Sequence, residues 1–298
     1  MKVAVMMSTY NGERYLDAQI ESLATQTVAD SITLYIRDDG SKDKTFDIIE
    51  SWKNKIHIEL ITGANLGPAK SFWDLLTNDD IQADYYAFCD QDDVWDADKL
   101  EVAISKLNDH THFYACNSRL IDSEGTVIDE AYTKNQPVIS IPRLFVAGIV
   151  QGCAMVFSDS LRKHLVSRDI QCLPMHDIIV MLYAMSYGDI FWDFDTHFGY
   201  RVHSSNVVAR ENKSVFKKIR STYWNWKNSG KNSMSTVARE MLSKAGNLSE
   251  EDAAYLTLMS NYRTSLSAKL KLLFQKHTDR IPFRVLRSYR MRLLLNLL

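Results

Sequence analysis

The sequence is poor in cysteine, with four in 298 residues, and no two of them form a C-x-x-C pair. This spacing argues against a zinc site or a disulfide framework, so we expect free thiols in a reducing compartment. The chain also lacks an uncharged apolar run of the roughly 18 residues that a membrane span needs. Its first apolar stretch, residues 3–7, is too short for the core of a signal peptide. We therefore expect a cytoplasmic protein that contacts a membrane at most from the side, at its inner face.

Charge is nearly balanced over the whole chain, with a net value of −2, but it is unevenly distributed. Residues 211–298 contain 17 Lys and Arg against 6 Asp and Glu, whereas residues 1–210 contain 18 against 31, so the two parts carry about +11 and −13. An acidic part of this size would repel phosphate, which argues against a nucleic-acid partner. It favours instead a metal or polar-ligand site.

A strand, a polar loop and a helix follow one another four times in the first part of the chain. The expected strands are residues 2–7, 32–37, 56–62 and 85–89, and the expected helices are residues 13–26, 44–52, 69–76 and 98–107. This alternation predicts an α/β fold with a mostly parallel, Rossmann-like sheet that is flanked by helices. The four loops then meet at one edge of the sheet, where such folds bind their ligands.

The rest of the chain is less regular. We expect strands over residues 113–121 and from residue 191, a hairpin turn at residues 122–125 and a helix over residues 178–187. Beyond residue 210 the sequence becomes helical, basic and aromatic, so we divide the chain into a domain of residues 1–210 and a C-terminal region of residues 211–298. Two interpretations of that region stay open: helices that contact an anionic membrane surface, or a subdomain that packs on the core.

The loop after residue 89 contains three carboxylates in four residues, Asp90, Asp92 and Asp93. Ionised carboxylates at this spacing repel one another, and a hard divalent cation such as Mg²⁺ or Mn²⁺ would neutralise them. The alternative is a solvated acidic turn in which Asp96 caps the next helix. Helix capping is also the simpler interpretation of Ser41 and Asn65 taken singly.

Four segments, residues 8–12, 38–43, 65–67 and 90–95, together resemble the family 2 glycosyltransferases, which are inverting enzymes of the GT-A fold. Residues 175–177 and 200–208 resemble the bacterial rhamnosyltransferase branch of that family. The resemblance covers about residues 2–210 and implies a role for each matching residue. The implied nucleotide-sugar site comprises Thr9, Tyr10, Asn11, Glu13, Asp38, Asp39, Asn65, Asp90, Gln91 and Arg201.

The resemblance also implies a metal site and a catalytic base. Asp92 would bind Mn²⁺ or Mg²⁺, with Asp90 and His203 beside it, and Asp177 would deprotonate the acceptor hydroxyl. Taken alone, the His176–Asp177 pair is more simply a helix cap. The acceptor pocket is assigned to Trp95, Gly152, Cys153 and His176.

The implied activity is metal-dependent, inverting transfer of a sugar, rhamnose from dTDP-rhamnose, onto a lipid-linked or growing cell-surface polysaccharide. A UDP-sugar donor is the alternative within the same fold. A metal-dependent phosphohydrolase or nucleotidyltransferase fits less well, because the first loop has no aspartate nucleophile and no glycine-rich pyrophosphorylase loop is present. A noncatalytic sugar- or nucleotide-binding scaffold is a third possibility.

Overall fold

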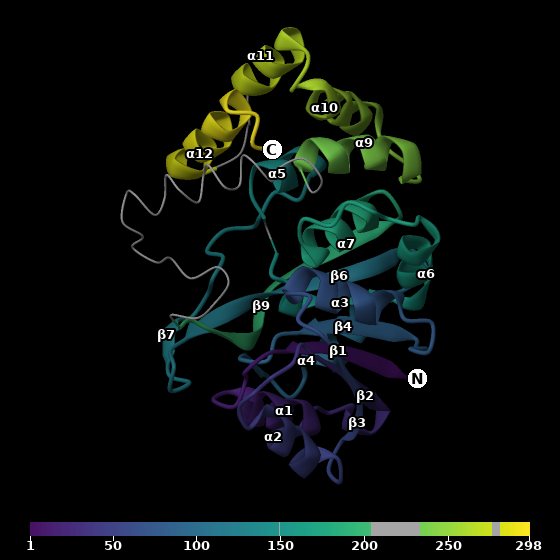
Figure 1. Cartoon of the computed structure of the whole chain (residues 1–298), viewed down its shortest axis with the longest axis vertical. Helices are drawn as coiled ribbons and strands as arrows, with labels where there is room; N and C mark the ends of the chain where they lie inside the picture. Colours follow the sequence, from purple (N-terminus) through teal and green to yellow (C-terminus); the bar gives the residue numbers. More distant parts are fainter. Residues whose placement is uncertain (149, 204–232, 276–280) are drawn as a thin grey trace.

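The computed structural model describes residues 1–148, 150–203, 233–275 and 281–298 (Figure 1). Within these residues one sheet holds all the strands, which are β1 Val3–Thr9, β2 Ile32–Asp38, β3 His57–Thr62, β4 Tyr85–Cys89, β5 Val94–Trp95, β6 Thr111–Ile121, β7 Val127–Asp129, β8 Met155–Ser158 and β9 Asp189–Arg201. The α-helices are α1 Leu16–Ala24, α2 Thr45–Trp52, α3 Pro68–Thr77, α4 Lys99–Lys106, α5 Ile141–Val146, α6 Asp159–Ser167, α7 His176–Met185, α9 Met234–Lys244, α10 Glu250–Asn261, α11 Leu266–Phe274 and α12 Phe283–Leu294.

The strand order is β3-β2-β1-β4-β8-β6-β9-β5, with β7 paired to β6. Strands β1 to β4, β6 and β9 share one direction, while β8, β5 and β7 run against their neighbours. The predicted α/β fold with a mostly parallel sheet is therefore confirmed. Because β8 is reversed, its first residues lie at the same edge as the carboxyl ends of β4 and β6.

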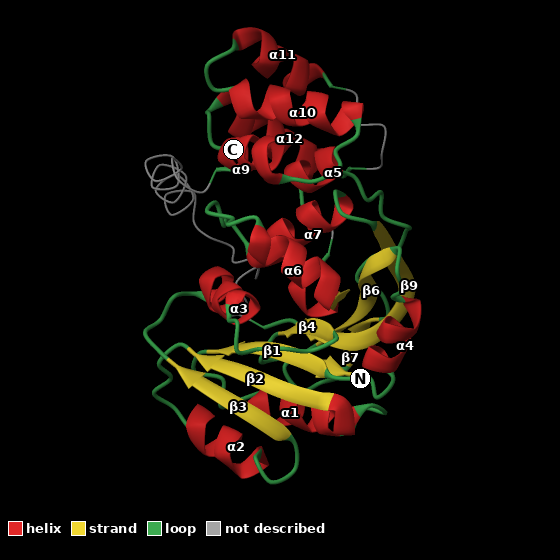
Figure 2. Ribbon diagram, turned by 90° about the vertical axis from the view of Figure 1, so that its right-hand side faces the viewer, coloured by secondary structure: helices red, strands yellow, loops and turns green. Residues whose placement is uncertain are grey.

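Helices cover both faces of the sheet (Figure 2). Alternate residues of β1 divide between two hydrophobic clusters, because successive side chains of a strand point to opposite faces. Val3, Val5 and Met7 pack with α1, α2 and α4, whereas Ala4 and Met6 pack with α3, α6 and α7. Both faces are buried, as a sheet built from strand–helix crossovers requires.

The C-terminal helices α9 to α12 form a bundle that stands on α5, above α7 (Figures 1 and 2). The rings of Phe145 and Tyr255 meet edge to face with centroids 5.6 Å apart. The Arg292 guanidinium donates to the carbonyl of Val146 at 3.4 Å. The bundle shares the larger hydrophobic cluster, so its described helices pack on the core. Residues 204–232, which include the aromatic stretch 216–226, lie outside the described residues.

Several element ends differ from those expected. Helix α1 begins at Leu16, not at residue 13, because residues 12–15 form a turn in which the Gly12 carbonyl accepts hydrogen bonds from the Tyr15 and Leu16 N–H groups. Asp96 does not cap α4, because the N-cap is Asp98. The Asp96 carboxylate instead accepts two hydrogen bonds from Arg119, at 2.7 and 2.5 Å. No helix within the described ranges combines the length and apolarity that crossing a bilayer requires.

Candidate functional site

The carboxyl ends of β2, β1 and β4 are neighbours in the sheet and hold the first predicted site residues. Thr9 and Asp38 end adjacent strands and pair in register, and the Thr9 hydroxyl donates to Asp38 at 2.8 Å. Asp38 is fully buried and also accepts the N–H groups of Gly40 at 2.9 Å and Ser41 at 2.8 Å, together with the Ser41 hydroxyl at 2.6 Å. Asp38 thus stabilises the loop that follows β2. Ser41 donates to Asp38 within that loop and does not cap α2, whose N-cap is Lys44.

Asp39 joins the loops after β2 and β3. Its carboxylate pairs with Arg37 and accepts the N–H groups of Leu66 at 3.0 Å and Gly67 at 2.9 Å. Asn65 is exposed and accepts the Gly67 N–H at 3.1 Å, while Gly67 itself is the N-cap of α3. The buried Arg37 was missed from the sequence; a basic residue inside an apolar strand, directly before two aspartates, was the available signal.

The loop after β1 is fastened on two sides. The Gln91 side chain accepts the Tyr10 N–H at 2.9 Å and donates to the Tyr10 carbonyl at 3.3 Å. Asn11 adopts a left-handed φ of 50° and accepts the Lys42 N–H at 2.9 Å, and Glu13 accepts the Lys44 N–H at 3.1 Å. These contacts leave the Tyr10 ring 48% exposed at the rim, where a planar ligand could stack on it.

The acidic loop after β4 meets the end of β9. Asp92 Oδ2 lies 2.7 Å from His203 Nε2. The buried Arg201 guanidinium donates to the Asp92 carbonyl at 2.8 Å, and the Arg201 N–H donates to Asp93 at 3.0 Å. The Tyr15 ring, which the sequence did not single out, lies beside His203 and under Arg201, with distances of 4.9 and 4.7 Å. Arg201 therefore fixes the acidic loop by donating to one backbone carbonyl and one carboxylate of that loop.

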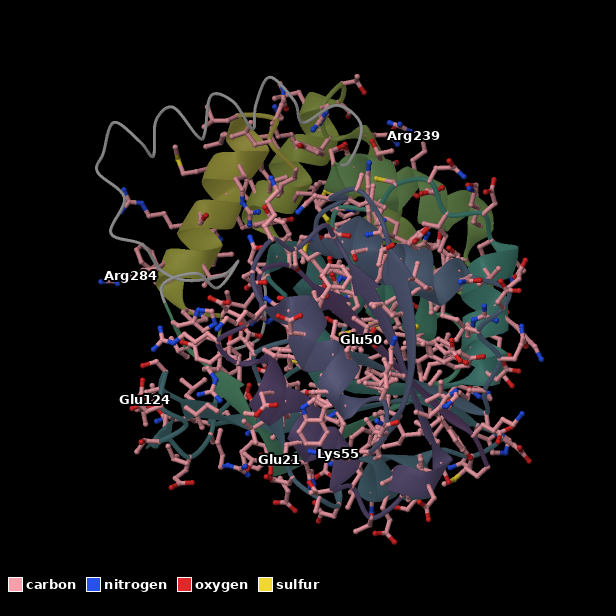
Figure 3. All side chains as sticks on the ribbon, turned by 60° about the horizontal axis from the view of Figure 1, so that its bottom comes forward. Glu21, Glu50, Lys55, Glu124, Arg239 and Arg284 are labelled. Atoms are coloured by element: carbon pink, nitrogen blue, oxygen red, sulfur yellow. The ribbon has the colours of Figure 1, made fainter. Side chains whose placement is uncertain are left out.

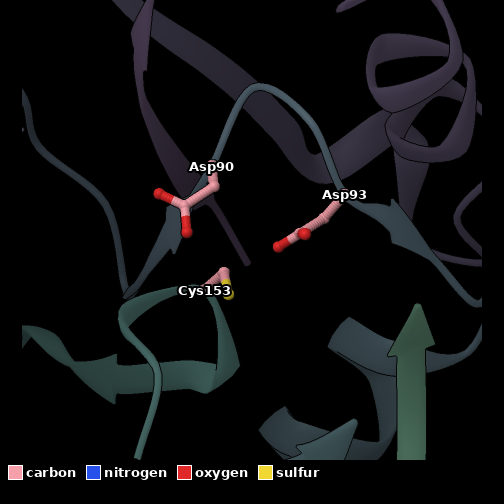
Figure 4. Close-up of side chains that lie close together, drawn as sticks. All are labelled: Asp90, Asp93 and Cys153. Carbon is pink, nitrogen blue, oxygen red and sulfur yellow. The ribbon is translucent and has the colours of Figure 1, made fainter. Parts of the chain in front are cut away.

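Two of the loop carboxylates converge on a thiol. Possible ligand atoms of Asp90, Asp93 and Cys153 all lie within 4.8 Å of one another (Figure 4). Burial and the neighbouring Asp92 raise the pKa of Asp90 to about 7 and that of Asp93 well above its usual range. Burial, with the nearby Asp93 and Asp90, also raises the pKa of the Cys153 thiol. These shifts indicate crowded negative charge that a bound cation would relieve.

The residues of this loop fit Mg²⁺ or Mn²⁺. Asp90 and Asp92 offer carboxylate oxygens, and His203 offers a ring nitrogen that already contacts Asp92. Cys153 fits such a hard cation less well, because its thiol stays protonated at neutral pH. Asp90, Asp92 and His203 have the donor atoms that a hard cation prefers, but within the described residues the structure does not bring them within 4.8 Å of one another, as it does those of Asp90, Asp93 and Cys153.

Asp177 faces this loop from the first turn of α7. Its carboxylate raises the pKa of Asp90, so the two groups are within electrostatic reach. Burial raises the pKa of Asp177 itself to about 6, while the Ile178 N–H, at 2.7 Å, favours the charged form. The N-cap of α7 is Met175, so neither His176 nor Asp177 caps the helix. At neutral pH most of the Asp177 carboxylate is ionised, and its raised pKa makes it a better proton acceptor than an ordinary aspartate.

Gly152 and His176 pack beside Asp177. A Cβ at Gly152 would lie 2.9 Å from His176 Nε2, which would have to move, and 3.5 Å from Asp177 Cβ, which is an ordinary van der Waals contact. The His176 ring stacks on Phe72 and meets Phe88 edge-on, with centroids 4.3 and 4.8 Å apart. Burial lowers the pKa of His176 to about 3, so it is a neutral spacer.

Trp95 is not brought into this group. It is 3% exposed and belongs to the cluster on the opposite face, with α1 and α4. Its backbone N–H donates to the Ser22 hydroxyl at 3.1 Å, and β5 pairs with β9, which turns the indole inward. An acceptor-pocket role for Trp95 would require contact with a ligand that this burial prevents.

The assembled site combines an exposed aromatic rim, an acidic loop suited to a cation and a carboxylate with a pKa near neutrality. A cation-ready loop suits a diphosphate, whose negative charge must be neutralised as it departs. A facing carboxylate of raised pKa suits removal of a proton from an attacking hydroxyl. The arrangement therefore supports group transfer from a diphosphate ester to an alcohol.

Comparison of the sequence with known proteins also indicates a group-transfer enzyme. A family model described as Glycosyl transferase family 2 matches residues 4–165. The dTDP-rhamnosyl transferase RfbG of Shigella flexneri is 33% identical over 219 residues, which are 68% of this chain and 73% of that protein. The putative glycosyltransferase EpsH of Bacillus subtilis is 26% identical over 235 residues, 72% of this chain and 64% of that protein.

Solved structures share the fold. The crystal structure of residues 1–349 of Staphylococcus aureus TarS in complex with UDP-GlcNAc covers 100% of this chain and 90% of its own, with a TM-score of 0.63 and 17% identity. The mannosyltransferase PcManGT of Pyrobaculum calidifontis, in complex with GDP-Man and Mn²⁺, has a TM-score of 0.57 and 15% identity, and the match covers 99% of this chain and 86% of that one. The predicted GT-A fold is thus confirmed, and the chain belongs to glycosyltransferase family 2.

Proposed function

We propose that the protein is an inverting, divalent-cation-dependent glycosyltransferase. It moves rhamnose from dTDP-rhamnose to a hydroxyl group of a lipid-linked or growing cell-surface polysaccharide. The observation that carries this proposal is the placement of Asp177 beside the acidic loop: a Cβ at Gly152 would lie 3.5 Å from Asp177 Cβ, and the thiol of the next residue, Cys153, lies within 4.8 Å of an Asp90 carboxylate oxygen. A base facing a diphosphate site is the arrangement that single displacement at an anomeric carbon needs.

In the proposed reaction the Asp177 carboxylate takes the proton of the acceptor hydroxyl. The hydroxyl oxygen forms a bond to the anomeric carbon as the bond between that carbon and the diphosphate oxygen breaks. The nucleoside diphosphate leaves with the bonding electron pair, and the anomeric centre inverts because attack and departure occur on opposite faces. A pKa of about 6 keeps Asp177 ionised at pH 7 while leaving it basic enough to accept the proton.

The donor would lie across the rim. Tyr10 offers an exposed ring for the base, and Thr9, Asn11, Glu13, Asp38, Asp39, Asn65 and Gln91 shape the loops around it. Asp90, Asp92 and His203 would hold Mn²⁺ or Mg²⁺, which when bound neutralises the charge of the departing diphosphate. Arg201 adds a buried positive charge behind the loop. Gly152 would border the acceptor side, with the buried Cys153 and His176 behind it.

The rhamnose donor rests on the 33% identity to the dTDP-rhamnosyl transferase RfbG. We test it with purified protein, Mn²⁺ or Mg²⁺ and a panel of dTDP- and UDP-sugars, measuring release of the nucleoside diphosphate. Cation-dependent release of dTDP from dTDP-rhamnose is expected. Turnover of UDP-sugars alone would replace the donor while keeping the enzyme class. Release of inorganic phosphate or pyrophosphate in place of a nucleoside diphosphate would overturn the proposal.

Peripheral contact with the inner face of the cell membrane is part of the proposal. Residues 262–275 and 281–298 contain seven Lys and Arg and no Asp or Glu. Exposed apolar side chains recur along α11 at Leu266, Leu270 and Phe274, which are 72%, 44% and 79% exposed, and Phe283 of α12 is 76% exposed. Arg284 projects from the start of α12 (Figure 3). An apolar stripe bordered by cations suits an anionic lipid surface.

We expect the double variant F274Q/F283Q to float less with vesicles that contain anionic lipid than the unchanged protein does. The loss follows from removing the two most exposed aromatic side chains of this surface. The variant I128S, which changes a 57% exposed residue on β7, is the matched control and should float normally. Equal flotation of all three proteins, or flotation that ignores lipid charge, would contradict membrane contact through α11 and α12.

A further inference from the structure

Helix α7, which carries Asp177 in its first turn, is held near its start by a residue of the C-terminal bundle. The carboxylate of Glu240 in α9 accepts the backbone N–H groups of Gln171 at 2.8 Å and Cys172 at 2.9 Å, one at each oxygen. Hydrogen bonds to an ionised carboxylate are stronger than those between neutral groups. The Glu240 side chain is only 11% exposed, so water has little access to these contacts.

The two residues bound by Glu240 lie close to the proposed base along the chain. Only residues 173–175 separate Cys172 from the start of α7. This linker has little freedom, because Leu173 is buried in the larger hydrophobic cluster and the ring of Pro174 fixes the φ angle there. A displacement of Cys172 would therefore be transmitted to the first turn of α7, where Asp177 lies.

The same part of the bundle also holds the other end of α7. Ser186 is the C-cap of α7, and its carbonyl accepts the N–H of Asn247, which lies just beyond the end of α9, at 3.1 Å. Between these two attachments, Val237, Ala238 and Met241 of α9 are buried in the hydrophobic cluster that contains α7. Helix α7 is thus attached to the bundle at both ends.

We propose that Glu240 is a positioning residue for the Asp177 base, and that the C-terminal bundle contributes to sugar transfer by fixing the start of α7. Glu240 acts through the backbone of Gln171 and Cys172, without contact with the donor or the acceptor. The effect on transfer rests on the proposed function, whereas the attachment of α7 to the bundle does not.

Lys244, one turn further along α9, offers a variant that separates this role from the general stability of the helix. Its ammonium group pairs with Glu240 Oε1 at 2.7 Å and also donates to the Asp169 carbonyl. E240Q and K244M both break this ion pair, but only E240Q removes the carboxylate that accepts the two N–H groups. The glutamine side chain keeps one acceptor oxygen and turns an NH₂ group toward the second donor. A role in helix stability alone predicts that the two variants behave alike.

E240Q should lower kcat by up to about two orders of magnitude, the loss that a displacement of about 1 Å in the active site can cause. Its affinity for dTDP in the presence of Mn²⁺, measured by calorimetric titration, should stay unchanged, because the loops proposed to hold the nucleotide are not attached to Glu240. K244M should keep most of the turnover. The control E251Q removes an exposed carboxylate from the first turn of α10 and should match the unchanged protein in both measurements.

Amide hydrogen exchange, measured by mass spectrometry on the protein without substrate, follows the attachment itself. Peptides that cover residues 170–178 should exchange faster in E240Q than in the unchanged protein, because the N–H groups of Gln171 and Cys172 have lost their charged acceptor. Peptides from β1 and β2 should exchange as before. K244M and E251Q should resemble the unchanged protein over residues 170–178.

Full turnover by E240Q would overturn the proposal, as would an equal loss in K244M or unchanged exchange over residues 170–178. If E240Q does not fold, E240D, whose carboxylate is set back by one methylene group, is measured in its place. Loss of turnover at unchanged dTDP affinity in E240D supports the proposal, and full turnover overturns it. Faster exchange in E240Q, together with no sugar transfer by the unchanged protein, would keep the attachment and contradict the proposed function. The two failures are therefore distinguishable.

Discussion

Replacing Asp177 by asparagine should lower the rate of sugar transfer by about two to four orders of magnitude, the usual contribution of a general base. Asparagine keeps the size of the side chain but cannot accept the proton of the acceptor hydroxyl. Donor binding should persist, because Asp177 lies opposite the loops proposed to hold the nucleotide. The measurement is a comparison of turnover with donor affinity, the latter from calorimetric titration of the nucleoside diphosphate.

The pH profile sharpens this prediction. The folded-state pKa of Asp177 is raised to about 6, so the active, ionised form is lost as the pH falls below that value. The unchanged protein should show a rate that rises with pH and levels off above about pH 6, and this limb should vanish in D177N. The control D47N alters an exposed aspartate in the first turn of α2 and should keep both rate and profile. Full transfer by D177N would refute the base assignment.

Replacing Asp92 by asparagine is expected to have the second large effect, a loss of about two orders of magnitude or more in transfer. Asp92 contacts His203 and stands at the centre of the crowded loop, where the cation is proposed to bind. Added Mn²⁺ should no longer raise the activity or the unfolding temperature. Both can be followed in one titration, by nucleoside diphosphate release and by thermal unfolding.

The unfolding temperature of D92N distinguishes loss of the cation site from a general loss of folded structure. The Asp92 charge raises the pKa values of Asp90 and Asp93, so its removal relieves repulsion in the cation-free protein. D92N should thus unfold at an unchanged or higher temperature when no cation is present, although it transfers poorly. D98N, which alters an exposed aspartate that makes no capping hydrogen bond, should behave like the unchanged protein. A D92N protein that keeps its full response to Mn²⁺ would contradict the metal assignment.

The N-terminal half of the fold could be predicted because local pattern determines it. Apolar strands followed by polar loops and amphipathic helices leave parallel β1 to β4 as the simple solution, and the hairpin turn at residues 122–125 has the expected geometry between β6 and β7. The reversed strand β8 has no such signature. Its four residues read only as part of an apolar run, and their direction is set by pairing with β4 and β6.

The sequence predicts where the candidate residues lie along the strands and helices but not what they contact. The sequence indicates that Asp38, Asp92 and Asp177 belong to strand ends and a helix start, and the structure places them there. The sequence could not reveal that the Asp38 carboxylate accepts hydrogen bonds from its own loop, because the donors are the backbone N–H groups of Gly40 and Ser41. Trp95 misleads for a similar reason: this neighbour of the acidic loop turns inward once β5 pairs with β9. Such choices depend on tertiary contacts.

The most direct test of the central claim is a crystal structure of the protein with Mn²⁺ and dTDP, with the cation located by its anomalous scattering. The account predicts one manganese peak bound by Asp92, next to the diphosphate, with the thymine over Tyr10 and the Asp177 carboxylate across the site, free to reach an acceptor hydroxyl. A manganese ion and nucleotide bound elsewhere, or an Asp177 side chain pointing away from the diphosphate, would contradict it.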